Sequence, residues 1–490
     1  MAMINGNDKS ILEFLQSRAL EGRARFHMPG HKGRALTGKF WDDLFKIDLT
    51  ELPDTDDLHE PEGMIARSQE RAAALWGAKR SFYLVGSSTA GILAGVLACV
   101  GDVGGGRISA HAQGEGNKSK KTVIIARNCH KSVYSACDIA RARKSFIMPD
   151  IDPESGIFLS IRPEQVGEAI EREKGRAALV VITSPTYDGV ISDVSGIARV
   201  CRKAGVPLMI DEAHGAHLGL GSTCGGEAVF PGGAVRAGAD IVIQSLHKTL
   251  PSLTQTGIAH FCSEDKELEG RFASMLARVQ SSSPSYVLMA SMDACVRLME
   301  SRGAELLRAW RDNCEYAAEE IAKIKNVRLF RPRSGAFGID PSKLCLITPD
   351  AGIYAEKLRK AGIDCEMALG RELLLYTGLG TEKEDIDRAV EALLRLDTEN
   401  IAELPHVPFP LKLPRRGRVR TDNAISEAGL ASPEAVLRSI GGVSTVYAWA
   451  YPPGIPLICP GERLDRPLAI WLAAFLASGR VRLHLDKPPV

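Results

Sequence analysis

The sequence predicts an α/β fold in which helices cover both faces of a mostly parallel sheet. From about residue 60 to 325, apolar runs alternate with candidate helices, and the runs are FYLVG, TVIIARN, ALVVITSPTY, VPLMIDEAH and ADIVIQSLH. This alternation is typical of parallel strands joined by helical crossovers. Each run ends in polar residues, and open α/β sheets bind ligands beyond the carboxyl ends of their strands. We therefore expect the polar ends to meet in one cleft.

A chain of 490 residues is too long for one simple core. Composition divides it into an N-terminal arm (1–55), a large domain (56–326), a small α/β domain (327–398) and a C-terminal domain (399–490). The arm carries the loop FHMPGHKGRALTG, and a polar, Gly-rich stretch from Gly101 to Lys121 predicts a surface loop. An amphipathic helix from Ala304 to Lys325 is expected to lead into the small domain. A Pro-rich linker (403–415) and a helix from Ser432 to Ile440 follow.

Charge and composition favour a small-molecule partner. The 61 basic and 60 acidic residues leave a formal charge near zero, and no long run of one sign suggests a nucleic-acid or membrane surface. The N-terminus has no apolar signal core, and no segment approaches about 18 consecutive apolar residues. Eleven scattered cysteines show no metal-binding spacing and predict reduced thiols. We expect a cytoplasmic protein without a metal.

The segment SLHKTLPSLTQTG places Lys248 directly after an apolar run, beside Ser245 and His247. A lysine amine in such a setting can form a Schiff base with an aldehyde, and pyridoxal 5'-phosphate is the common aldehyde partner. The hydroxyl of Ser245 and the imidazole of His247 could then bind the phosphate. The alternative is that Lys248 only caps a solvated turn.

Two further strand ends offer what such a cofactor requires. The stretch GSSTAG precedes an apolar helix, so Ser88 and Thr89 could bind the phosphate at its N-terminus. Asp211 ends the run VPLMI, and a carboxylate facing the pyridine nitrogen keeps that nitrogen protonated. Both patterns also fit ordinary helix caps.

The remaining strand ends supply candidates for contact with the ring or the substrate. His130, in RNCHKS, follows TVIIA, where an imidazole could stack on the pyridine and offer a proton. Thr186 and Tyr187, in SPTYDG, could touch ring substituents or substrate. A structural histidine and a simple Pro/Gly turn are the alternatives.

Together, SLHKTLPSLTQTG, DEAHGAHLG, RNCHKS, SPTYDG, FHMPGHKG and YPPGIPLICPGE resemble the bacterial ornithine/lysine/arginine decarboxylases, from about residue 25 to 465 and in that family's order. The resemblance implies a fold type I (aspartate aminotransferase-like) large domain that binds pyridoxal 5'-phosphate. It implies that Lys248 attaches the cofactor, that Asp211 pairs with the pyridinium and that His130 stacks on the ring. Ser245, His247, Ser88 and Thr89 fall at the phosphate contacts, although VGSST replaces the asparagine-glycine pair of relatives.

The resemblance implies decarboxylation of arginine, lysine or ornithine to an amine of the polyamine pathway. The reaction consumes one proton, which Lys248 or His130 would donate to Cα. Glu462 is the candidate for the distal amine or guanidinium group, with His214 and Thr186 as further substrate contacts. The acidic segment from Asp48 to Gly63 could attract a cation, but we expect mostly a solvated loop. The chain starts too close to FHMPGHKG for the receiver-like domain of longer members, so a homodimer or dimer of dimers is expected instead of large rings.

Two other classes of function remain open from the sequence. An aminotransferase or aldolase of the same fold would use the same lysine and aspartate, with Arg371 or Arg359 available to hold the substrate carboxylate. A non-catalytic binding protein on this fold would be expected to lack part of the set formed by Lys248, Asp211 and His130, and all three are present.

Overall fold

The computed structural model describes residues 9–21, 29, 32, 34, 42–101, 121–220, 229–404, 420, 423–451, 453–477 and 483–488. These residues leave out most of three segments that the sequence predicts, namely the FHMPGHKG loop, the loop between Gly101 and Lys121, and the Pro-rich linker. The chain forms two compact units. Unit 1 comprises Met1–Asn117 and Pro207–Ala309, and unit 2 comprises Lys118–Val206 and Trp310–Val490.

Four strands of unit 1 lie in the order β1 (Arg80–Leu84), β8 (Gly257–Phe261), β7 (Ile241–Gln244) and β6 (Leu208–Asp211). Strands β6 and β7 are parallel, whereas β8 runs antiparallel to both of its neighbours. Apart from Arg80 at the start of β1, every residue of these strands is buried, as expected for apolar strands with both faces covered.

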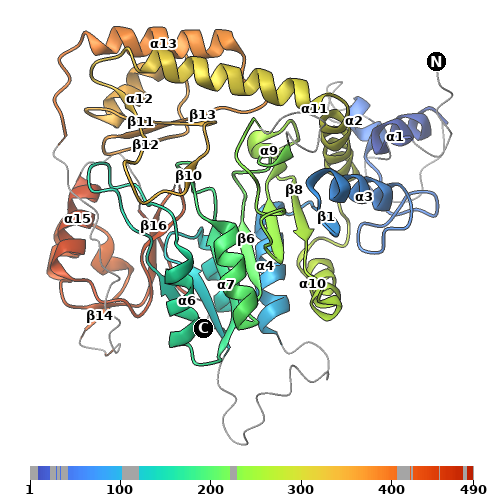
Figure 1. The fold of residues 1–490 in the computed structure, drawn as a ribbon, viewed down its shortest axis with the longest axis horizontal. Coiled ribbons are helices and arrows are strands. Elements are labelled where there is room, and N and C mark those ends of the chain that lie inside the picture. The colour runs from blue at the N-terminus through green and yellow to red at the C-terminus, as the bar shows by residue number, and fades with distance from the viewer. Residues whose placement is uncertain are drawn as a thin grey trace, which may run out of the picture. The chain divides into compact units, whose positions relative to one another are not determined.

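The helices of unit 1 are α1 (Ile11–Leu20), α2 (Asp42–Ile47), α3 (Met64–Trp76), α4 (Ser87–Val100), α9 (Leu246–Thr249) and α10 (Lys266–Val279), together with the first part of α11 (Tyr286–Ile321). Helix α4 contacts all four strands and packs against α10 (Figure 1). Asp265 caps α10 by accepting hydrogen bonds from the backbone N–H groups of Glu267 and Leu268. Packing on α4 therefore fixes where its N-terminus meets the strand ends.

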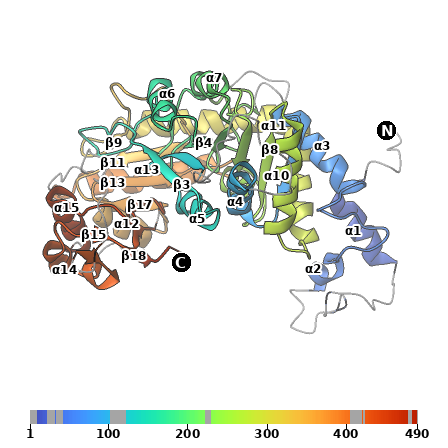
Figure 2. The same cartoon turned by 90° about the horizontal axis from the view of Figure 1, so that it is seen from below.

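Unit 2 contains a parallel sheet in the order β4 (Ala177–Thr183), β2 (Thr122–Ala126) and β3 (Arg143–Ile147). Figure 2 shows α5 (Lys131–Ile139) and α6 (Pro163–Arg172) on opposite sides of β3. Helix α7 (Val194–Ala204) packs beside α6. Asp193 caps α7, and Gly205 ends it with a left-handed conformation.

A second, antiparallel sheet of unit 2 has the order β12 (Met367–Leu369), β13 (Glu372–Tyr376), β11 (Lys343–Ile347) and β9 (Arg328–Leu329). Helices α12 (Ala351–Lys360) and α13 (Lys383–Asp397) share a core with it and with the end of α11. A short pair joins β10 (Gly338–Ile339) to β5 (Val190–Ile191), next to the SPTYDG turn.

The last part of unit 2 has its own apolar core. It contains the pair β14 (Ala424–Ile425) and β15 (Val443–Ser444), the sheet β17 (Pro456–Ile458), β16 (Tyr447–Ala450) and β18 (Leu483–Asp486), a 3-10 helix (Glu427–Leu430), and helices α14 (Pro433–Arg438) and α15 (Arg466–Ala477). Ser432 caps α14, close to where the sequence predicts that helix.

The five predicted strands form β1, β2, β4, β6 and β7, and the mostly parallel character is confirmed. The sequence did not predict β3 or the antiparallel β8 as strands. The predicted helix from Ala304 is longer, because α11 begins at Tyr286. In the described part of the chain, no helix is long and apolar enough to cross a membrane.

Candidate active site

Lys248 lies on the short helix α9, immediately beyond the carboxyl end of β7. Its Nζ lies 2.9 Å from Nε2 of His214, which follows the carboxyl end of β6. Since β6 and β7 are parallel neighbours, the turns after them open at the same edge of the sheet. The fold thus brings the predicted cofactor lysine and the predicted substrate contact His214 together within unit 1.

Asp211 is the last residue of β6 and is only 2% exposed. Burial raises the pKa of its carboxyl group, while the positive charge of Lys248 and the N–H of Ala213 oppose that rise. The Ala213 N–H donates to Oδ1 at 3.2 Å. A second cationic group facing Asp211 would favour the ionised carboxylate further. A pyridinium nitrogen is a cation of this kind.

Ser245 carries a buried hydroxyl with no hydrogen-bond partner among the described residues, and the hydroxyl of Thr249 on the same short helix shares this property. Buried hydroxyls normally have partners, so these two groups indicate a missing polar ligand. His247 donates from Nδ1 to the carbonyl of Thr256 at 2.6 Å, which leaves Nε2 as the nitrogen for another contact. Burial lowers the pKa of His247, with a smaller contribution from the charge of Lys248.

Gly257 marks where the end of β7, the start of β8 and the start of α4 meet. A Cβ at this position would lie 3.0 Å from both the backbone nitrogen of Ser88 and the carbonyl oxygen of Gln244, so a side chain would force these segments apart. Helix α4 begins after Gly86 with no side-chain cap. Ser88 and Thr89 therefore lie in the first turn of α4, where the N–H of Ser88 is placed to receive an anion, whereas the Thr89 N–H already donates to Oγ of Ser87 at 3.3 Å.

These features of unit 1 fit pyridoxal 5'-phosphate. The unpartnered hydroxyl of Ser245 and the uncapped start of α4 suit a phosphate, Lys248 supplies an amine for the aldehyde, and buried Asp211 suits a protonated ring nitrogen. No group of three or more potential metal ligands occurs in the described ranges.

His130 lies in unit 2 as the N-cap of α5. Its Nδ1 accepts a hydrogen bond from the Ser132 N–H at 3.2 Å, so Nε2 carries the ring proton in the neutral form. Gly454, with φ of +79°, approaches the ring closely, because a Cβ there would lie 3.1 Å from Nε2. The YPPG segment thus needs glycine beside this imidazole.

Glu462 also lies in unit 2 and is buried against Arg127. Oε1 and Oε2 accept from Nε and Nη2 of Arg127 at 3.2 and 3.1 Å, and Oε2 also accepts from the Cys459 N–H at 2.7 Å. Both side chains are nearly inaccessible to solvent. The carboxylate proposed for the distal end of the substrate therefore already has a cationic partner, which the sequence analysis missed although Arg127 begins the RNCHKS motif.

Thr186, in unit 2, closes the SPTYDG turn. Its hydroxyl accepts a hydrogen bond from the Val190 N–H at 3.0 Å, and its own N–H donates to the Val190 carbonyl at 2.8 Å. The peptide bond between Ser184 and Pro185 is cis. The structure thus shows a turn-forming role for Thr186, and its contact with substrate stays a prediction.

One residue of the acidic segment before α3, Asp56, has a structural role. Asp56 accepts hydrogen bonds from the backbone N–H groups of Glu62, Gly63, Ile65 and Ala66, which holds the start of α3.

The two arginines considered as carboxylate clamps have other partners, since Arg359 pairs with Asp364 and Arg371 with Glu403.

A buried polar chain behind Asp211 was not predicted. Glu212 accepts from the Ala234 N–H and from Nε2 of Gln244, and Oε1 of Gln244 accepts from Nε2 of His260 at 3.1 Å. Burial lowers the pKa of His260 to about 3, so the ring is neutral and its Nδ1 accepts from the hydroxyl of Ser81. The signal available in the sequence was Glu212 itself, a charged residue directly after a buried strand.

Comparison with known proteins places these residues in a family. The family model described as Orn/Lys/Arg decarboxylase, major domain, matches residues 11–351. YaaO of Bacillus subtilis, an uncharacterized protein, is 32% identical over 90% of this chain and 88% of its own length. The arginine decarboxylase of the same organism is 29% identical over 91% of this chain and 89% of its own length.

Solved structures agree on the fold. The lysine decarboxylase LdcF of Francisella novicida superposes with a TM-score of 0.74 at 18% identity, over 98% of this chain and 79% of that one. An alanine–glyoxylate aminotransferase from Nostoc reaches a TM-score of 0.52 at 14% identity, over 68% of this chain and 86% of that one. The predicted α/β fold of type I and its cofactor are thereby confirmed. The chain belongs to the Orn/Lys/Arg decarboxylase family and is a pyridoxal phosphate-dependent amino-acid decarboxylase.

Proposed function

We propose that this decarboxylase of basic amino acids acts on L-arginine, releasing carbon dioxide and the corresponding amine for polyamine synthesis. Four relatives named arginine decarboxylase are each 29% identical and align over 89–93% of their own lengths. The lysine decarboxylase LdcA of Pseudomonas aeruginosa is 22% identical and aligns over 71% of its length. The relatives therefore favour arginine over lysine.

The observation that carries the proposed chemistry is the grouping of Lys248, His214 and Asp211 at one edge of the unit 1 sheet. Lys248 attaches the cofactor through its amine, and Asp211 holds the ring nitrogen in its protonated form. Ser245, His247, Ser88 and Thr89 bind the phosphate. His130 is assigned to the face of the ring on its match to the family motif alone.

When bound, pyridoxal phosphate accepts the electron pair that the departing carboxylate leaves on Cα. Lys248 then returns a proton to Cα, and His130 is the alternative donor. His214, with Nε2 beside the lysine amine, orients that amine and can exchange a proton with it. Thr186 and Glu462 are kept as proposed substrate contacts, and for Glu462 this requires that the pairing with Arg127 change or be shared.

Purified holoenzyme incubated separately with L-arginine, L-lysine and L-ornithine tests the substrate, with kcat/KM as the measure. Carbon dioxide release that is fastest with arginine supports the proposal. A higher kcat/KM for lysine or ornithine than for arginine would identify that amino acid as the substrate instead. Each assay is repeated with a 2-oxo acid as amino acceptor. Keto acid formed from the amino acid without carbon dioxide would then identify an aminotransferase, and no turnover under either condition would favour a binding protein.

Replacement of Lys248 tests the attachment residue. Lys248→Ala is expected to lose the cofactor adduct that borohydride reduction fixes on wild-type enzyme, and mass spectrometry of the peptide detects that adduct. Lys266→Ala is the matched control, because Lys266 is a surface lysine of the same unit and pairs with Glu269. An adduct that persists in Lys248→Ala would contradict the assignment.

We also propose that the enzyme is a homodimer or a dimer of dimers in the cytoplasm. Enzymes of this fold commonly share residues between subunits, which makes a dimer the smallest expected active form. Light scattering on the purified holoenzyme measures the assembly directly.

A further inference from the structure

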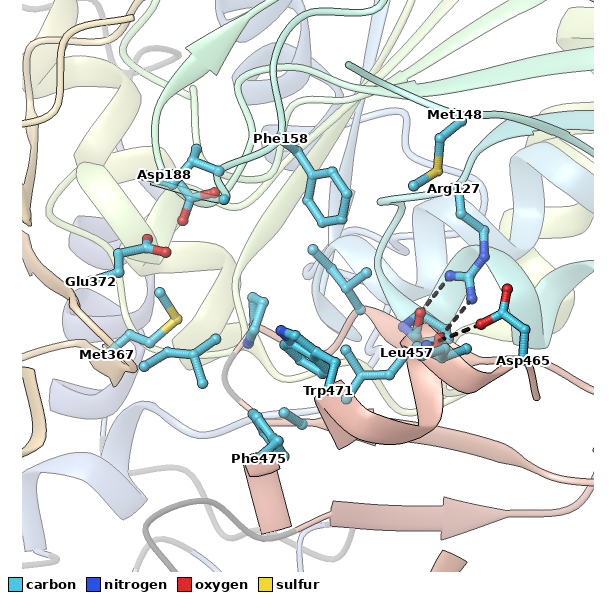
Figure 3. A pocket seen from close by; sticks show the side chains of 18 residues that line it. Arg127, Met148, Phe158, Asp188, Met367, Glu372, Leu457, Asp465, Trp471 and Phe475 are labelled. Carbon is cyan, nitrogen blue, oxygen red and sulfur yellow. Dashed lines mark hydrogen bonds between the residues drawn. The ribbon is translucent and has the colours of Figure 1, made fainter. Parts of the chain in front are cut away.

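Unit 2 encloses a cavity of about 110 Å³ that the proposed chemistry does not use (Figure 3). A cavity needs roughly 10–15 Å³ to hold one water, so this cavity has room for a small organic molecule. Most of the lining is apolar, including Phe158, Met367, Leu457, Trp471 and Phe475. Four charged or acidic side chains reach it, Arg127, Asp188, Glu372 and Asp465.

Two of these polar side chains have other partners. Arg127 forms the buried ion pair with Glu462 and also donates to the Leu457 carbonyl. Asp465 accepts a hydrogen bond from the Leu468 N–H at 3.0 Å and so caps the start of α15. Neither therefore requires a ligand in the cavity.

The other two, Asp188 and Glu372, form a carboxyl pair. Figure 3 shows their side chains turned toward each other on one side of the cavity. Burial raises the pKa of both, and the hydrogen bond between them raises the pKa of Glu372 and lowers that of Asp188. Where two carboxyl groups share a site, one of them keeps its proton, so the pair carries a single negative charge.

Among the described residues, no cationic side chain balances the negative charge shared by this pair. Within the described ranges, no lysine or arginine contributes to the pKa of either carboxyl group or pairs with it. A buried charge without a counterion is costly, so a cationic ligand that replaced the missing partner would be stabilised there.

The aromatic wall of the cavity suits the same kind of ligand. Trp471 and Phe475 stack with ring centroids 5.1 Å apart, and Figure 3 shows Phe158 above Trp471, with the carboxyl pair to the left of both. Aromatic faces attract cations and also bury alkyl groups.

We propose that this cavity binds a small alkylammonium ion, with its charged nitrogen at Asp188 and Glu372 and its hydrocarbon chain against Phe158, Trp471 and Phe475. The products of a basic amino-acid decarboxylase carry this alkylammonium group together with a second charged group at the far end, so the cavity would be a second site, in unit 2, for molecules that resemble one end of the product. The inference does not depend on which amino acid is decarboxylated.

Calorimetric titration of the holoenzyme with N-methylpentylamine tests the proposal. A secondary amine cannot form a neutral imine with the cofactor, so the probe avoids that reaction. We expect one probe bound per chain and at least about tenfold weaker binding of 1-pentanol, which has the hydrocarbon chain without the charge. The proposal is overturned if the wild-type enzyme binds no amine or binds the alcohol equally well.

The double variant Asp188→Asn with Glu372→Gln removes the charge while keeping the shape of the pair, and it should bind the amine at least about tenfold more weakly. The double variant Glu356→Gln with Glu391→Gln is the control, because it removes two surface carboxylates of unit 2 that pair with Lys360 and Arg395. Equal affinity in both double variants would overturn the proposal.

Leu457→Trp provides an independent variant that fills the cavity and leaves the carboxyl pair intact. It should also lose amine binding, and unchanged binding would place the amine elsewhere. Turnover of the basic amino acid is measured in parallel with every variant. Because calorimetry needs no substrate, failure of amine binding and failure of the proposed decarboxylation give separate results.

Discussion

Nζ of Lys248 and Nε2 of His214 lie 2.9 Å apart at the carboxyl edge of the unit 1 sheet. The two residues are 34 positions apart in the chain and follow the parallel strands β7 and β6. Their contact therefore follows from the fold and orients the amine that we propose binds the cofactor. The imidazole can also take up a proton from that amine.

Replacing His214 by alanine is expected to lower kcat by about 10²-fold while the cofactor remains bound, because the imidazole assists proton transfer but does not form the covalent link. Single-turnover kinetics and cofactor content measure the two effects separately. His484→Ala, at an exposed position of β18, is the control and should keep wild-type kcat. Full activity in His214→Ala would contradict the role of this imidazole in proton transfer.

Replacing Ser245 by alanine is expected to weaken cofactor binding by about 1–2 kcal/mol without lowering the stability of the cofactor-free protein. The reason is that the buried hydroxyl of Ser245 has no partner among the described residues, so its loss breaks no described hydrogen bond. Ser81→Ala is the contrasting variant, since it leaves Nδ1 of His260 without its donor and should destabilise the protein. Cofactor titration and chemical denaturation measure the two quantities, and an unchanged cofactor affinity in Ser245→Ala would contradict the phosphate role.

The strands that the sequence predicted are those with unbroken apolar runs. The run TVIIA forms β2 with every residue buried, and VPLMID gives β6. Strand β3 was missed because RKSFI is half polar and only partly buried. Strand β8 was missed because GIAHF contains His260, whose burial depends on hydrogen bonds to Ser81 and Gln244 from neighbouring strands. Such compensation is invisible to a local pattern.

The part of the site formed by strand ends could also be predicted. Asp211 ends β6, and His214 and Lys248 follow the parallel strands β6 and β7, so their proximity required only the strand order. Arg127 and Glu462 are 335 positions apart, and their pairing depends on how the C-terminal segment folds against β2. Nothing in the spacing of charges along the chain indicated that contact.

Replacing Asp211 by asparagine is expected to lower kcat far more than Asp211→Glu does, because asparagine cannot be anionic and so cannot hold the ring nitrogen protonated. In the cofactor-free protein the same change removes a carboxyl group whose pKa is raised by burial, so stability should be kept or increased. Steady-state kinetics of the holoenzyme and denaturation of the apoenzyme measure both effects. Equal kcat in Asp211→Asn and wild type would rule out the assigned role.

Removing one partner of the buried Arg127–Glu462 pair is expected to cost about 3–5 kcal/mol of stability, because a buried charge is left unpaired. The double variant Arg127→Met with Glu462→Leu removes both charges and should recover most of that loss. Denaturation measures stability, and kcat/KM on the recovered double variant tests the proposed substrate role of Glu462. A stable double variant with wild-type kcat/KM would leave Glu462 with a structural role only.

Replacing Glu372 by glutamine is expected to flatten the pH dependence of stability above about pH 5. In the unfolded chain a glutamate has a pKa of about 4.3, whereas burial and the hydrogen bond to Asp188 raise the folded pKa of Glu372 well above that value. Between the two pKa values the folded state holds more protons than the unfolded state. Stability is therefore greatest below the unfolded pKa and is lost as pH rises through the folded pKa.

Glutamine can still donate to Asp188 but has no proton to lose, so the variant should be more stable than wild type at about pH 8 and similar at about pH 4, with a difference of about 1.4 kcal/mol for each pKa unit of the shift. Urea denaturation across this pH range measures it. The surface variant Glu356→Gln, which loses only the exposed pair with Lys360, should follow the wild-type curve. Parallel curves for Glu372→Gln and wild type would mean that Glu372 is ionised in the folded protein, and the negative charge of the pair would then be larger than one.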